Sequence, residues 1–156
     1  MKNILKLLPI LCIVLSCNSD KKQEKTASTS QPKELSNDTA VDQKSDQLKA
    51  SIKEGKFIYN DLCITCHMGN GEGVQRAFPP VADSDYLKNN QEASILAIKN
   101  GMSGEIVVNG ITYNSAMAPL GLSNEEVADV MNYINHSWGN DYGDLITPQE
   151  VAKITE

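Results

Sequence analysis

Apolar residues recur at helical spacing in three stretches of the chain, and these stretches predict its main helices. The first runs from about Asp46 or Gln47 to Asn60, the second covers residues 91–100 and is closed by Gly101, and the last major helix begins at Ser123. In the last helix Ser123 and Glu126 have the spacing of a capping box. Its expected apolar face consists of Val127, Val130, Met131, Ile134 and Trp138.

The segments between these helices carry different signals. Asn109-Gly110 separates the β-prone runs 106–108 and 111–113, which predicts a two-residue hairpin. We expect residues 68–81, which are rich in glycine and proline, to be irregular. A short helical turn is expected near residues 84–88, and residues 147–150 can start one final short helix.

The first 17 residues have the pattern of a processing signal. Two lysines precede the apolar run Leu7–Leu15, which is much too short to span a bilayer. The segment Val14-Leu15-Ser16-Cys17 resembles the bacterial lipobox, in which cleavage leaves a diacylated N-terminal cysteine. We therefore expect residues 1–17 to be a lipoprotein signal peptide and Cys17 to anchor an extracytoplasmic protein to a bacterial membrane, facing the periplasm. The alternative is an ordinary secretory signal followed by an unmodified cysteine.

Charge and polarity divide the rest of the chain. Residues 18–46 contain five lysines, six acidic residues and no aromatic residue, which predicts a disordered tether with an end-to-end distance of about 30 Å. Residues 47–156, the expected folded domain, hold seven lysines and arginines against fourteen aspartates and glutamates. This excess of negative charge argues against nucleic acid as a partner and favours proteins that present a positive patch.

The motif Cys63-Ile64-Thr65-Cys66-His67 carries the chemistry. Two thiols three residues apart on a helical turn can reach the two vinyl groups of one haem, while the adjacent histidine binds its iron. A zinc site would need a fourth ligand, and the only other histidine is His136. A redox dithiol would need a strand before the motif, where a helix is expected. The sequence therefore predicts one covalently bound haem c.

Further motifs accompany this one in a characteristic order. They are Gly55-x-x-x-Tyr59, Gly69-x-Gly71-x-Gly73, Phe78-Pro79-Pro80, and Tyr113-Asn114-x-x-Met117 ahead of the capped last helix. With the Cys-x-x-Cys-His motif, they make residues of about 47–140 resemble a class I cytochrome c domain. This resemblance implies an all-α fold with crossing terminal helices, haem-wrapping loops and a small β-hairpin insertion. Gly55 and Tyr59 would pack against the last helix near Val130, Tyr133 or Ile134.

The resemblance also implies a methionine on the face of the iron opposite His67. Met117 is the expected ligand, because the family places its sulfur ligand in the loop between the hairpin and the last helix. Met131 lies on the apolar face of that helix and is expected to be core. Met102 follows a helix cap and would have to reach past the hairpin.

The resemblance further implies groups that would support the haem without binding its iron. The backbone carbonyl of Pro79 or Pro80 would accept a hydrogen bond from Nδ1 of His67 and fix the imidazole's orientation. Arg76 is the only arginine of the domain and is expected either to neutralise a haem propionate or to stay exposed and unpaired.

These features predict a membrane-tethered one-electron carrier that shuttles electrons between respiratory enzymes and is not itself an enzyme. A narrower similarity, in residues 78–87, 108–113 and 137–140, is to cytochrome c domains associated with copper nitrite reductases, alcohol dehydrogenases and related respiratory enzymes. One alternative is a haem enzyme or gas-binding protein with a displaceable sixth ligand. Another is a fixed electron-transfer subunit of a larger oxidoreductase.

Overall fold

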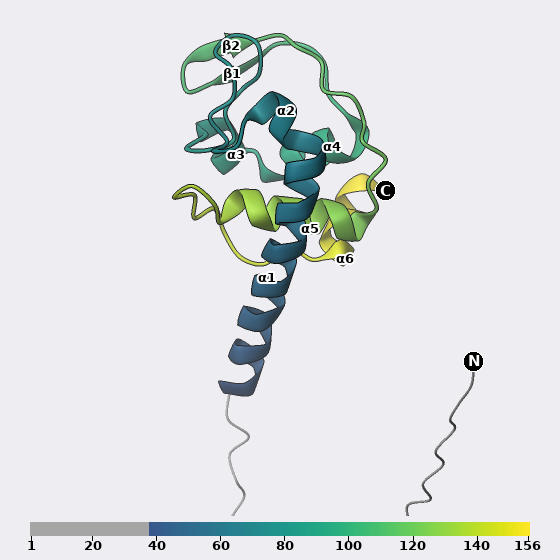
Figure 1. Ribbon diagram of the computed structural model, residues 1–156. Helices are drawn as coiled ribbons and strands as arrows, with labels where there is room; N and C mark the ends of the chain where they lie inside the picture. Colours follow the sequence, from purple (N-terminus) through teal and green to yellow (C-terminus); the bar gives the residue numbers. More distant parts are fainter. Residues whose placement is uncertain (1–37) are drawn as a thin grey trace, which may run out of the picture. The chain divides into compact units, whose positions relative to one another are not determined.

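The computed structural model describes residues 38–156, which form a mainly helical domain with one small hairpin (Figure 1). Its elements are α1 (Asp38–Ile58), the π-helical turn η1 (Tyr59–Cys63), α2 (Ile64–His67), α3 (Asp85–Asn89), α4 (Gln91–Asn100), β1 (Ile106–Val108), β2 (Ile111–Tyr113), α5 (Asn124–Asn135) and α6 (Pro148–Thr155). The expected signal peptide, Cys17 and the tether up to residue 37 lie outside the described residues. None of the helices between residues 38 and 156 combines the length and apolar character needed to cross a bilayer.

The first helix begins earlier than predicted, at Asp38 rather than near Asp46. Residues 41–47 are exposed, so no burial of apolar side chains accounts for this extension, and the prediction that residues 38–46 belong to a disordered tether is wrong. Once the buried part of a helix is formed, each added turn costs little, because nucleation is the unfavourable step. The ion pair between Lys49 and Asp46, 3.1 Å apart and three residues apart in sequence, supports the extension weakly.

The crossing of α1 and α5 forms the centre of the fold (Figure 1). The two helices approach so closely at Gly55 that a Cβ atom there would lie 1.9 Å from the backbone oxygen of Asp129 and 2.9 Å from Cβ of Tyr133. One turn further along, the fully buried ring of Tyr59 packs against the ring of Tyr133, with their centres 5.4 Å apart. The expected contact of Gly55 and Tyr59 with the last helix is confirmed.

Local sequence signals place most of the other elements as predicted. Both α5 and α6 begin with a capping box, from Ser123 to Glu126 and from Thr147 to Glu150. The predicted helix over residues 91–100 is α4, with Gly101 as its C-cap. In the hairpin Val108 pairs with Ile111, and positive φ angles of 51° at Asn109 and 74° at Gly110 make the expected two-residue turn.

The position of Trp138 differs from the prediction. Helix α5 ends at Asn135, and Trp138 lies beyond it in a turn with a φ of 54° rather than on the helical face. Its ring packs against Tyr59 and Tyr133, with centre distances of 5.0 and 5.3 Å. The indole thus covers one end of the helix crossing.

Candidate functional site

The Cys-x-x-Cys-His motif lies on one continuous helical segment that α1 begins. The backbone N–H of Ile64 donates to the oxygen of Tyr59, five residues back, so the chain makes one π-helical turn just before the motif. This turn keeps both Tyr59 and Cys63 buried, and α2 then carries Cys66 and His67. The sequence did not predict the turn, because no local signal distinguishes it from a continued α-helix.

The imidazole of His67 is held by the loop that follows it. Its Nδ1 lies 2.9 Å from the carbonyl oxygen of Pro79, and since a carbonyl only accepts, Nδ1 carries the proton. Burial lowers the pKa of His67, while the hydrogen bond to Pro79 opposes this shift. A neutral ring with a protonated Nδ1 leaves the Nε2 lone pair free to bind a metal. The acceptor is thus Pro79 rather than Pro80, which lines the cavity beside it.

Gly73 brings the Pro79 carbonyl into reach. Its backbone N–H donates to the oxygen of His67 at 3.0 Å, and its φ of 63° is left-handed. A Cβ atom there would lie 2.4 Å from the oxygen of Phe78 and 2.7 Å from that of Pro79. Glycine is therefore required for this loop to return so closely to the histidine.

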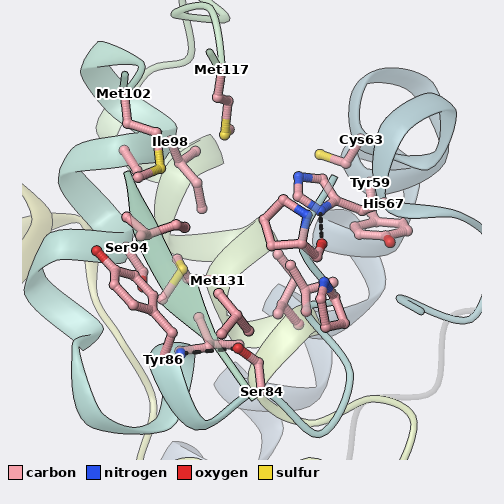
Figure 2. Close-up of a pocket in the computed structure, with 18 residues that line it drawn as sticks. Tyr59, Cys63, His67, Ser84, Tyr86, Ser94, Ile98, Met102, Met117 and Met131 are labelled. Carbon is pink, nitrogen blue, oxygen red and sulfur yellow. Dashed lines mark hydrogen bonds between the residues drawn. The ribbon is translucent and has the colours of Figure 1, made fainter. Parts of the chain in front are cut away.

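A largely apolar cavity opens in front of the imidazole (Figure 2). It adjoins a second hollow, and both are lined by Cys63, His67, Pro79, Met102, Ile106 and Met117. The side chain of Met117 extends into this space opposite His67, with its sulfur toward the interior. An apolar slot with one nitrogen donor and one thioether on opposite sides, and a cysteine at its edge, fits a flat, apolar iron porphyrin.

The other two candidate methionines also reach the cavity. Met131 is fully buried, as expected for a core residue of α5. Met102 was expected to be separated from the site by the hairpin, and this expectation is wrong. Its backbone pairs directly with that of Met117, because the hairpin folds out between the two segments and leaves their ends side by side.

The remaining predicted residues lie at the edge of the site or outside it. Arg76 is exposed in the loop after the motif, with a φ of 64°, and lines neither cavity. Its role toward a propionate stays a prediction. His136, the other histidine, is half-buried at the end of α5, where its Nδ1 lies 2.9 Å from the carbonyl oxygen of Asn132.

Three supporting contacts were missed from the sequence. The hydroxyl of Tyr59 donates to the carbonyl of Met68 at 2.8 Å, and that of Ser115 donates to the carbonyl of Ala77 at 2.5 Å. The side-chain amide of the buried Asn140 donates to the carbonyls of Val81 and Ile134. Two of these bonds, from Ser115 to Ala77 and from Asn140 to Val81, join residues 38 and 59 positions apart, and the other two bridge loops that have no regular spacing, so no local pattern signals them.

The geometry disfavours the two other readings of the cysteine motif. Burial, reinforced by the neighbouring Cys66, raises the pKa of the Cys63 thiol to about 11, whereas a reactive dithiol needs a lowered pKa. Within residues 38–156, no cluster of three or more His, Cys, Asp or Glu side chains is placed to hold a metal ion. The cavity and its opposed donors instead define a haem protein of the electron-carrying c type.

The chain belongs to the cytochrome c family: the family model described as Cytochrome c matches residues 52–138. It is accordingly an electron carrier that binds haem c covalently. The matched segment begins in the buried part of α1 and ends at Trp138, so it includes the helix crossing, both cavity loops and the hairpin.

Named relatives agree with this assignment. Cytochrome c-552 of Thermus thermophilus is 38% identical over 92 residues, which cover 56% of this chain and 70% of that protein. The cytochrome c subunit of the quinone alcohol dehydrogenase of Gluconobacter oxydans is 31% identical over 104 residues, covering 64% of this chain and 21% of the subunit. The cytochrome c subunit of gluconate 2-dehydrogenase from Pantoea cypripedii is 29% identical over 104 residues, covering 64% and 23%. The chain thus spans about a fifth of the length of the dehydrogenase subunits.

Proposed function

We propose that this protein is a membrane-tethered carrier of single electrons, with one haem c attached through Cys63 and Cys66 and its iron bound by His67 and Met117. The observation that carries the proposal is the arrangement across the cavity. The imidazole of His67, fixed through Nδ1 by Pro79, faces the thioether of Met117 with an apolar space between them (Figure 2).

A bound haem would supply a reversible one-electron couple, and the residues of the chain would adjust its reduction potential. A neutral thioether favours Fe(II) and raises the reduction potential, and the hydrogen bond to Pro79 orients His67 and increases its basicity. Walls such as Val81, Leu87 and Ile98 exclude water. If His67 and Met117 both bind the iron of a bound haem, substrates and gases would find no vacant ligand position there. This arrangement suits electron exchange and not bond chemistry.

The ligands are tested on the holoprotein matured in a host that attaches haem c. Denatured protein should keep its haem, and its mass should include the porphyrin. The long-wavelength absorption band expected of a methionine-ligated ferric haem should be present and should disappear in Met117→Ala. Ready binding of carbon monoxide to the reduced wild-type protein would contradict this assignment and favour the haem-enzyme or gas-binding alternative.

Arg76 and Pro80 complete the proposed site. Pro80 contributes to the cavity wall and to the stiffness of the loop that presents the Pro79 carbonyl. Arg76 would approach a haem propionate from its exposed position on the neighbouring loop. Arg76→Gln should then lower the reduction potential, because a positive charge near the haem favours the reduced state. An unchanged reduction potential would indicate that Arg76 is exposed to solvent and does not interact with a propionate.

The proposed partners are respiratory redox proteins. The domain's fourteen acidic residues against seven basic ones favour partners with a positive docking patch. The relatives named as dehydrogenase subunits support an oxidoreductase as donor. Purification in mild detergent separates a free shuttle, which elutes alone, from a fixed subunit, which keeps an enzyme attached.

The proposed location is outside the cytoplasm, on a membrane, through a lipid at Cys17. The support comes from the apolar run Leu7–Leu15 and the lipobox-like Val14–Cys17. In cell fractionation, the wild-type protein should remain with the membranes, and Cys17→Ser should release it. Membrane association that persists in Cys17→Ser would exclude the lipid anchor without affecting the haem assignment.

A further inference from the structure

A short backbone bridge joins the end of α4 to the loop that carries Met117. The N–H of Met102 donates to the oxygen of Met117, and the N–H of Met117 donates to the oxygen of Met102, each at 2.9 Å. Among the backbone hydrogen bonds of residues 38–156, these two are the ones that hold the loop 114–122. Residues opposed in this way direct their side chains to the same side, and both methionines enter the cavity (Figure 2).

Gly101 makes the close approach possible. Its φ is 74°, and a Cβ atom on it would lie 2.6 Å from the oxygen of Met117 and 2.8 Å from the nitrogen of Pro119. These neighbours are a backbone carbonyl and a prolyl nitrogen, which cannot rotate away as a flexible side chain would. Any residue other than glycine must push the Met117 loop outward.

The helix behind this contact is firmly anchored. Ile95 and Ile98 of α4 are buried in the core, and Nζ of Lys99 donates to the carbonyl of Leu122 at 2.7 Å, where the loop ends. The C-terminus of α4 is therefore a fixed support, whereas the loop itself contributes the exposed residues Ala116, Ala118 and Pro119. The position of the Met117 backbone is set from outside the loop.

We propose that Gly101 and the backbone of Met102 are positioning elements that fix the reach of the Met117 thioether toward the iron. The proposal rests on the proposed role of Met117 as a ligand. From the sequence, Gly101 was expected only to end the helix over residues 91–100. If that were its whole role, replacing it would not affect Met117. We call this contact of Gly101 and the paired backbone of Met102 with the Met117 loop the clamp. If the clamp acts as proposed, loosening it weakens the bond between the iron and the Met117 sulfur, while the fold and the covalent haem remain.

The test compares Gly101→Ala with Gly121→Ala in the holoprotein. Gly121 has nearly the same φ, 71°, but nothing lies within 4 Å of a Cβ placed on it, so it controls for backbone strain alone. Free imidazole competes with methionine for ferric iron, and its apparent affinity reports the strength of the sulfur bond. We expect that affinity to rise at least about tenfold in Gly101→Ala, with a weaker long-wavelength band, and to change less than about threefold in Gly121→Ala. Equal affinities in the two variants would overturn the proposal.

A second measurement uses the wild-type protein alone, in case Gly101→Ala does not fold. In hydrogen exchange of the reduced holoprotein, the amides of Met102 and Met117 should be protected, while those of Ala116 and Ala118 exchange rapidly. Rapid exchange at Met117 would also overturn the clamp. If Met117→Leu keeps the long-wavelength band, the ligand assignment itself fails. If that variant loses the band but Gly101→Ala behaves as wild type, the clamp alone fails.

Discussion

Replacing Gly55 with alanine adds one methyl group where α1 crosses α5. The new Cβ atom would lie 1.9 Å from the backbone oxygen of Asp129, and ordinary contact begins at 3.4 Å, so the helices must separate by about 1.5 Å, the difference between the two. Because the obstacle is helix backbone, no side-chain rotation can relieve it. The separation also loosens the packing of Tyr59 against Tyr133.

Two opposing terms set the size of the effect. Alanine is favoured over glycine inside a helix by up to about 1 kcal/mol. Overpacking that forces backbone movement costs about 1–3 kcal/mol, and the short distance to the Asp129 backbone places this case at or above the upper end. We expect Gly55→Ala to lower the free energy of unfolding by about 2 kcal/mol.

The assay is denaturant unfolding of the holoprotein, followed in parallel by helical circular dichroism and by haem absorption. Lys56→Ala is the matched control, since it changes the adjacent, exposed residue of α1 and should shift the free energy of unfolding by less than about 0.5 kcal/mol. A Gly55→Ala protein as stable as the wild type, or more stable, would show that helix propensity outweighs the contact and would refute the reasoning.

Three other perturbations test single contacts. Tyr59→Phe removes the donor to the Met68 carbonyl and should reduce the free energy of unfolding by about 1 kcal/mol in denaturant; an unchanged midpoint would mean that the bond contributes nothing. Ser123→Ala removes the N-cap of α5 and should cost about 1 kcal/mol, whereas Ser123→Gly should cost only a few tenths; equal losses would contradict the cap. Burial raises the pKa of Asp129 above its unfolded value, so its ionisation costs stability as the pH rises through the window between the two. Asp129→Asn should therefore be more stable than the wild type at neutral pH, and thermal unfolding should show the gain shrinking as the pH falls through that window; a pH-independent gain would contradict the raised pKa.

Elements with a local cause were predictable from the sequence. The start of α5 at Ser123, the end of α4 at Gly101 and the hairpin turn at Asn109-Gly110 each depend on residues within four positions of one another. The hydrogen bond from His67 to a proline carbonyl was narrowed to two candidates, and the structure selects Pro79. These two candidates came from the resemblance to class I cytochrome c domains.

Features that depend on distant segments were not predictable. The sequence contains no signal that Met102 would lie beside Met117, because the two are fifteen positions apart and the pairing depends on how the hairpin folds outward. The start of α1 was missed because residues 41–47 are exposed and the sequence before Asp46 shows no apolar periodicity. Trp138 matched the apolar face of α5 in spacing, but the helix ends before it reaches that residue.

The π-helical turn has a consequence for how the length of this segment can vary. From Gly55 through Tyr59–Cys63 to His67 the chain is helical without interruption, so the number of residues sets the angle between the glycine contact and the iron-binding imidazole. Each residue of an α-helix turns the chain by about 100°, whereas a π turn holds about one residue more per turn. The number of α-helical residues before the π turn therefore cannot change without rotating the imidazole by about that angle away from its slot. An exposed side chain such as that of Lys56 can be exchanged here, but the number of residues between the glycine contact and the π turn is fixed.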